Sequence, residues 1–459
     1  MSRSYSQAAR KALSEKELEK EREKEREKER EKEREEEREE ERKKELYSKG
    51  CVAQCINFVV GKASKEVNVL DVEEKFSHNL ATILARDNEV VAVWLRILQD
   101  RCEIYLSKNS CWLDKDNEYI ENITNYLKNI SDNAPAKSGD TEYNFFTAVA
   151  NYCYTKLKYR LNKLKGDIRF YGNNEYVKYF KNFLSDKENN TKPMMISKIC
   201  SKFYMAVKND PNAPTKFLEH LKKVGSYMVS VRGILECAHN AQYKSLFSNV
   251  QIIKVDPVII NKQHIYSWKN IIKRFIDEDK YNRFMDRCSK NPEVMERINK
   301  VYTVHTDNAT REQQPLDGID VIQCNTYLHA ELGILALIIN KKINSRVFIA
   351  VSKSCCYLCG LYLDFVIKQG YNIAIYGKHM KLYSRWIFPH VDNNDFNTRS
   401  LKFLLENLNR IIEMNLNNHI KSLPAGPDSP GNSPDPYNSD DDVYEYAKFN
   451  GLNNYTLIN

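Results

Sequence analysis

The distribution of apolar and polar positions divides the chain into segments of different character. Residues 15–45 contain a single apolar residue, Leu18, within a run of alternating acidic and basic side chains. A coiled coil needs apolar residues at its a and d positions, and this segment lacks them. We therefore predict a charged low-complexity helix over residues 1–46, isolated, solvated and partly frayed. Its role would be that of a spacer, with a specific interaction arm as the alternative.

Residues 47–290 have the spacing of amphipathic helices, because apolar residues recur every three or four positions. One such stripe consists of Leu80, Ile83, Leu84, Val90, Val91, Trp94, Ile97 and Leu98. A second consists of Phe217, Leu221, Val224, Met228 and Val231. We predict a mainly helical domain over 47–290, with these stripes facing its core.

The pattern changes after residue 291. Short apolar runs predict strands at 300–305, 320–327, 345–352 and 372–377, and longer ones predict helices at 328–339 and 356–369. The order strand, helix, strand over 345–377 is typical of a crossover unit with two parallel strands. We predict an α/β domain over 291–422 that ends in an amphipathic helix around 401–412. The acidic segment 423–459, rich in Pro, Ser and Asp, should be disordered.

Composition and charge narrow the setting in which the chain works. The 459 residues include no run of eighteen apolar residues and no basic-flanked apolar segment at the N-terminus. We therefore expect no membrane span and no signal peptide, and an intracellular protein, cytoplasmic or nuclear, with reduced cysteines. Residues 46–422 carry a net charge of +14. Such a charge favours a polyanionic partner, which would be nucleic acid (DNA or RNA) or a nucleotide.

The densest group of cysteines is SKSCCYLC at residues 352–359. Cys356 and Cys359 form a C-x-x-C pair at the predicted start of a helix, where free backbone N–H groups favour a thiolate. The pair alone fits a redox site as well as a metal site. His329 heads the preceding predicted helix and completes three ligands of the mixed type that zinc accepts. Three protein ligands leave a position for water, as in catalytic sites, whereas a fourth ligand such as Cys355 would make a structural site.

A carboxylate follows the histidine after one residue. Glu331 lies at the head of an otherwise apolar helix, where burying a charge is unfavourable unless it has a function. HAE at 329–331, followed by the cysteines of 352–359, resembles the zinc signature of the cytidine deaminase-like superfamily. Together with YGKHMKLYSRWIFP at 376–389, the segment is most similar to the OTT-type deaminases, which are prominent in fungi and predicted to act on nucleic acids. Cys355 departs from the family pattern, because a proline usually precedes the first ligand cysteine.

The resemblance implies a fold, a cofactor and a set of roles. The fold would be a three-layer α/β/α domain with a mixed sheet, and His329, Cys356 and Cys359 would hold Zn²⁺. Zinc would lower the pKa of its bound water toward about 7. Glu331 would take the proton of that water, pass it to the ring nitrogen of the base and assist the loss of ammonia. The carbon attacked would be C4 of cytosine or C6 of adenine.

Several residues are candidates for contact with the base. Ala330 could contact it through its backbone, and Asn325, just before the helix, could contact the sugar or base or simply form a turn. His379 and Trp386 could lie at the pocket mouth, although a core position is favoured for the tryptophan.

We therefore predict a zinc-dependent hydrolytic deaminase of a nucleobase within nucleic acid. One alternative is a deaminase of free nucleosides or nucleotides. A second is a zinc-binding interaction protein without turnover, and a third is an effector that deaminates a host target.

Overall fold

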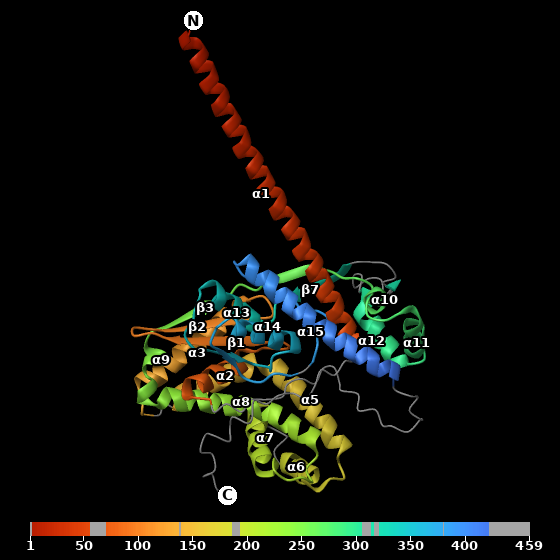
Figure 1. The fold of residues 1–459 in the computed structure, drawn as a ribbon. Coiled ribbons are helices and arrows are strands. Elements are labelled where there is room, and N and C mark those ends of the chain that lie inside the picture. Colours follow the sequence, from red (N-terminus) through yellow and green to blue (C-terminus); the bar gives the residue numbers. More distant parts are fainter. Residues whose placement is uncertain are drawn as a thin grey trace.

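The computed structural model describes residues 2–55, 70–136, 139–185, 193–304, 314–315, 321–379 and 381–421. The molecule combines a mixed five-stranded sheet with many helices and belongs to the α/β class (Figure 1). The main helices are α1 (Ser2–Cys55), α2 (Val72–Leu84), α3 (Asp114–Asp132), α4 (Gly139–Tyr152), α5 (Tyr154–Phe170), α6 (Glu175–Ser185), α7 (Pro193–Val207), α8 (Thr215–His239), α9 (Ser245–Ser248), α10 (Trp268–Lys273), α11 (Glu278–Ser289), α12 (Pro292–Tyr302), α13 (Ala330–Asn340), α14 (Tyr357–Lys368) and α15 (Asn394–Lys421). The strands are β1 (Val91–Ile97), β2 (Cys102–Lys108), β3 (Val250–Lys254), β4 (Ile259–His264), β5 (Thr303–Val304), β6 (Gln314–Pro315), β7 (Val321–Tyr327), β8 (Val347–Val351) and β9 (Ile373–Ile375).

The five-stranded sheet draws its strands from distant parts of the chain, in the order β3-β2-β1-β8-β9. β1 is antiparallel to both β2 and β8, with Val93 opposite Leu106 on one side and Ala350 on the other. β2 pairs with β3 in parallel, and β8 pairs with β9 in parallel. The predicted crossover unit of two parallel strands around α14 is therefore confirmed.

Helices cover both faces of this sheet. Alternate residues of a strand point to opposite faces, so Val91 and Val93 join the core that contains α2 and α8. Ala92 and Trp94 join the core that contains α13 and α14. α13 lies very close to β2, because a Cβ on Gly333 would be 2.5 Å from the Ser107 hydroxyl oxygen. The predicted three-layer α/β/α arrangement is confirmed.

The sequence predicts helical structure along the stripe over residues 80–98, and this prediction is wrong for the second half of the stripe. α2 ends at Leu84, a turn with Asp87 at φ 51° follows, and β1 begins at Val91. β1 is apolar on both sides because helices cover both faces of the sheet, so the alternation expected of a strand is absent. Residues 47–290 are still mostly helical where described, but β1 to β4 lie among them.

Two strand predictions after residue 291 also need correction. The strand predicted at 300–305 is wrong for most of its length, because α12 continues to Tyr302 and β5 spans only Thr303–Val304. The strand predicted at 320–327 is confirmed as β7, but it pairs with β4 outside the five-stranded sheet. The division at 291 stays a prediction, with β1, β2 and β3 of the sheet lying before it. The tail 423–459 lies outside the described residues.

α1 projects from the body of the molecule as a long rod (Figure 1). Residues 22–38 are exposed, as predicted for a solvated helix, whereas Leu46, Cys51 and Val52 are buried against the body. The helix therefore continues beyond the charged segment and is anchored by its last turns. Along the described part of the chain, no helix is both long and apolar enough to cross a bilayer.

Candidate metal centre and its cavity

The candidate metal ligands lie at the first turns of two helices. His329 is the N-cap residue of α13, and Cys356 is the N-cap residue of α14. Cys359 lies one turn into α14, and its backbone N–H donates to the Cys356 sulfur at 3.4 Å. β8 separates the two helices in sequence, so both start at the same end of the sheet, as the sequence predicts.

The three side chains come together without any other residue between them. The His329 Nδ1 atom is 3.2 Å from the Cys359 sulfur and 3.6 Å from the Cys356 sulfur, and the two sulfurs are 3.3 Å apart. All three atoms lie within 4.8 Å of one another and could hold a metal ion. Both cysteines are buried, and the imidazole is 22% exposed.

The electrostatics of the site favour one negative sulfur. Burial raises the pKa of Cys356, but a hydrogen bond from Cys359 and the charge of His329 outweigh it and hold that pKa well below its ordinary value. Burial lowers the pKa of His329, yet Cys356 and Glu331 raise it to about 9. The pKa of Cys359 lies well above normal because of burial and the neighbouring Cys356. Metal binding requires deprotonated sulfur and neutral imidazole. A bound cation would therefore replace the protons that the raised pKa values place on His329 and Cys359.

Glu331 faces a cavity beside these ligands. Its Oε1 atom lies 3.9 Å from the His329 Nδ1 atom, and the side chain is buried. Burial raises the pKa of Glu331, and the Cys356 charge adds to the effect. The cavity measures about 220 Å³ and is lined by Asn88, Val90, Asn109, His329, Ala330, Glu331, Lys353, Ser354, Cys356, His379 and Tyr383. A carboxyl group of raised pKa therefore shares a small chamber with the possible metal ligands.

The group of residues that could hold a metal ion does not include Cys355, whose backbone pairs with the segment 377–379. The Cys355 N–H donates to the Gly377 carbonyl at 3.2 Å, and its carbonyl accepts from the His379 N–H at 2.9 Å. The Cys355 side chain is buried, and burial raises its pKa well above the usual value. The geometry brings together His329 with Cys356 and Cys359, which is the combination that the sequence favours.

The other candidate residues lie in different places. Ala330 and His379 line the cavity. Trp386 is buried in the core, and its indole N–H donates to the Cys359 sulfur at 3.2 Å, so it supports a ligand instead of lining the mouth. Asn325 belongs to β7, but its side chain lies outside the described residues. The ring of Tyr383 packs edge-on against His329 and His379, with centroids 6.0 and 5.8 Å apart.

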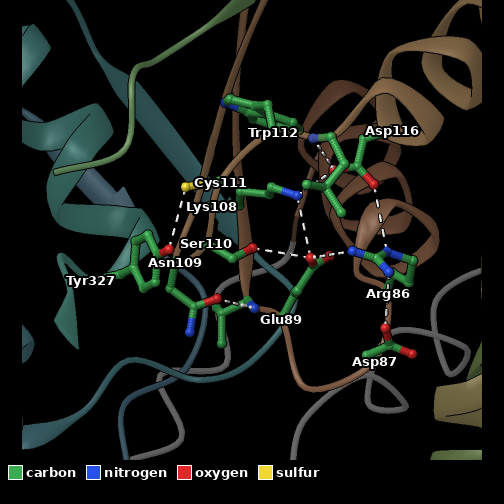
Figure 2. A network of polar contacts seen from close by, with 12 residues as sticks. Arg86, Asp87, Glu89, Lys108, Asn109, Ser110, Cys111, Trp112, Asp116 and Tyr327 are labelled. Atoms are coloured by element: carbon green, nitrogen blue, oxygen red, sulfur yellow. Dashed lines mark hydrogen bonds and ion pairs between the residues drawn. The ribbon is translucent and has the colours of Figure 1, made fainter. Parts of the chain in front are cut away.

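A buried polar network supports the part of the cavity wall formed by Asn88, Val90 and Asn109 (Figure 2). The Lys108 ammonium donates to Glu89 at 3.2 Å and also to Asp116, and the side chains of Lys108 and Asp116 are almost fully buried. Arg86 donates to Glu89 at 3.0 Å. Asn109, next to Lys108, accepts the Val90 N–H at 2.6 Å. The network therefore fixes the two chain segments that carry Asn88, Val90 and Asn109 to the cavity.

Sequence reasoning missed much of this wall. Asn88, Val90 and Asn109 fall within the segment interpreted as helical, and no local signal connects them with residues more than 200 positions later. Lys353 and Ser354 directly precede the cysteine cluster, so their position in the sequence could have suggested them. Tyr383 lies within the segment 376–389 on which the family resemblance partly rests.

Comparison with known proteins supports a deaminase at this centre. Residues 328–390 match the model of the OTT_1508-like deaminase family. The matched segment begins just before His329 and includes Glu331, Cys356 and Cys359, but it omits β1, β2 and β3. No curated protein and no solved structure matches the chain. The segment is thus similar to a deaminase family over the residues that hold the possible metal site.

Proposed function

We propose that this protein is a zinc-dependent hydrolytic deaminase that converts cytosine or adenine within a polynucleotide. The observation that carries the proposal is the convergence of His329, Cys356 and Cys359 beside the buried carboxyl of Glu331. The match of residues 328–390 to a deaminase family gives independent support.

The donor set fits zinc. One imidazole and two sulfurs are a ligand combination that zinc accepts, and three protein ligands leave a fourth position open. Tetrahedral zinc would separate two sulfurs by about 3.8 Å and a sulfur from a nitrogen by about 3.5 Å. The observed separations of 3.3 Å between the sulfurs and of 3.2 and 3.6 Å to the nitrogen need outward shifts of about half an ångström at most. When bound, zinc supplies a Lewis acid that makes water acidic enough to attack at neutral pH.

Glu331 is the acid and base of the proposed reaction. Its raised pKa suits a group that accepts a proton from the attacking water and then delivers it to the ring nitrogen of the base. The same carboxyl then moves a second proton, taken from the hydroxyl newly bonded to the ring carbon, to the departing amino group, which leaves as ammonia while the carbon becomes a carbonyl. A metal site with a purely structural role has no need of this buried acid, which argues against the inactive interaction protein.

The cavity is suited to one unstacked base. Its volume of about 220 Å³ excludes a duplex, so a base in a polynucleotide must enter from a single strand or after flipping. The rings of Tyr383 and His379 line the cavity, and aromatic rings of this kind are surfaces against which a base can stack. Asn88 and Asn109 add polar groups to the cavity wall, and Lys353 brings a positive charge to the same cavity. The alternative substrate, a free nucleoside or nucleotide, fits the same chamber.

Metal analysis and a substrate panel test the proposal. The purified full chain should contain about one zinc ion and should form uracil or hypoxanthine from single-stranded DNA or RNA. Glu331→Gln keeps the shape of the side chain, so it should retain zinc while the rate falls at least about 100-fold. Product from free nucleosides alone would favour the alternative substrate. Zinc-loaded protein that forms no product from any substrate, or a fully active Glu331→Gln variant, would overturn the proposed reaction.

A further inference from the structure

Helix α5 presents an exposed face in which basic and aromatic residues alternate. Its buried face is apolar and includes Leu157, Leu161 and Leu164. The opposite face carries exposed Lys158, Lys165 and Arg169, half-buried Lys163, and the rings of Tyr154, Tyr159 and Phe170. These rings are 46%, 47% and 81% exposed, far more than aromatic residues in a core would be. We name this set of seven residues the α5 face.

The α5 face is also strongly positive. α5 carries six Lys and Arg residues and a single acid, Asp167. Asp167 is buried and paired with His220, so it does not lower the charge of the exposed side. Lys158 lies 5.8 Å from the ring centroid of Tyr154, and Lys163 lies 4.9 Å from that of Tyr159. Cations and rings are therefore interleaved along one side of the helix.

α5 begins beside the cavity and leads away from it. The Lys156 ammonium, on the buried side, donates to the Glu89 carbonyl at 3.0 Å, and residues 88 and 90 on either side of Glu89 line the cavity. The Cys153 thiol, just before α5, donates to the Ile83 carbonyl at 3.2 Å. Further along, Arg160 donates to the Lys223 carbonyl of α8. In Figure 1, α5 runs beside α8 toward α6, on the side of the molecule opposite the projecting part of α1.

We infer that the α5 face binds a single-stranded polynucleotide and guides it toward the cavity. Its cations match the phosphates, and its rings provide stacking surfaces for unpaired bases, which is the usual combination in single-strand binding sites. Seventeen residues of helix span about 25 Å, the length of about seven nucleotides in a stacked strand. An anionic membrane is a poorer fit, because the continuous apolar face of α5 is already buried in the protein and cannot insert. Only the claim that the bound polynucleotide leads to the cavity rests on the proposed function, since binding to the α5 face itself needs no turnover.

The test measures binding of fluorescein-labelled single-stranded DNA and RNA to the full chain by fluorescence anisotropy. A face variant combines Lys158→Ala, Lys165→Ala and Arg169→Ala. A matched control, the α11 control, combines Arg283→Ala, Arg287→Ala and Lys290→Ala. It removes the same charge from exposed positions on α11 and at its C-cap, away from α5 (Figure 1). Both sets are surface substitutions with small expected effects on stability, which circular dichroism verifies.

The face variant should bind each oligonucleotide about 10- to 100-fold more weakly than wild type at about 0.1 M salt. Its plot of log affinity against log salt should be shallower by about 2, since each lost phosphate contact in a single strand removes about 0.7. Tyr159→Ala should weaken binding about fivefold or more without changing the salt slope, because it removes stacking and no charge. The α11 control should bind within about twofold of wild type, because its loss of charge touches no phosphate.

The outcomes separate this inference from the proposed function. Equal affinities of the face variant and the α11 control would overturn the inference, whatever the activity. Duplex bound as tightly as single strands would overturn it too. No oligonucleotide bound even at low salt would also overturn it and leave the face to a protein partner. If binding depends on the α5 face while no substrate is turned over, the inference stands and the proposed reaction fails.

Discussion

Replacing Lys108 by methionine should destabilise the fold and loosen the wall of the cavity. The ammonium lies between Glu89 and Asp116 in the network of Figure 2, and the Lys108 and Asp116 side chains are 1% and 0% exposed. Removing one partner of a buried ion pair costs about 3–5 kcal/mol. Asp116 would keep the Leu113 N–H at 2.9 Å and the Tyr152 hydroxyl at 3.0 Å. We therefore expect a loss near the lower limit, about 3 kcal/mol at pH 7.

The network should respond to acid in a defined direction. Burial raises the pKa of Asp116, but the hydrogen bond from Lys108 and further contacts outweigh it, and the pKa lies below the usual carboxyl value. The unfolded chain then takes up a proton before the folded chain does. The stabilisation is fully present above about pH 4 and is lost as the pH falls through the lower folded value. At pH 7 the comparison of wild type with Lys108→Met therefore measures the complete contribution.

Urea unfolding, followed by circular dichroism and tryptophan fluorescence, gives the free energies. Trp112 is a local reporter, because its ring lies 4.9 Å from the Lys108 ammonium. Lys115→Met is the matched control, since Lys115 is an exposed residue on the adjoining helix α3 and should change stability by less than about 0.5 kcal/mol. Lys108→Met should also raise KM more than it lowers kcat, because Asn109 lines the cavity. A loss no larger than that of Lys115→Met would refute the stabilising role of the network.

Three further predictions concern the metal, its support and acid sensitivity. Cys356→Ser should lose most of its zinc, whereas Cys355→Ala should keep about one ion per chain by metal analysis; equal losses would contradict this choice of ligand. Trp386→Phe removes the N–H that bonds to a ligand sulfur, so zinc affinity in a chelator competition should fall about 10- to 100-fold, and an unchanged affinity would show that the bond is dispensable. Burial lowers the pKa of His78 to about 4, so the unfolded chain binds a proton first as the pH falls below about 6.5. About 2 kcal/mol of stability should be lost between pH 7 and pH 5. Denaturant unfolding at pH 7 and pH 5 measures this loss of stability. The loss should be smaller for His78→Gln than for a His264→Gln control at an exposed position. Equal losses in the two variants would show that His78 does not cause it.

The possible metal site could be predicted because its signals are local. His329 and Glu331 lie together at one helix start, and Cys356 and Cys359 lie together at the next. Residues 345–377 form a strand, a helix and a strand without interruption, so their pairing could be predicted from order alone. Within such short segments, the spacing of residues along the chain determines their spacing in three dimensions.

The strands that complete the sheet could not be predicted in this way. β1 pairs with β8, so Ala92 lies opposite Val351 although more than 250 residues separate them. The helices α3 to α9 lie in the chain between β2 and β3, two strands that are neighbours in the sheet. Apolar runs covered on both faces carry no period that distinguishes a strand from a helix. The wall with Asn88 and Asn109 depends on this long-range pairing and was missed for the same reason.

The position of β1 between β2 and β8 has a practical consequence for anyone who wants to shorten the protein. Expression of residues 291–422 alone would leave β8 with a bare, apolar edge, which invites pairing between copies and precipitation. During synthesis on the ribosome the corresponding edge of β1 stays unpaired, since β1 emerges long before its partner at 347–351 has been synthesised. Truncations that preserve the sheet must start before α2 at Val72 and keep everything through β9.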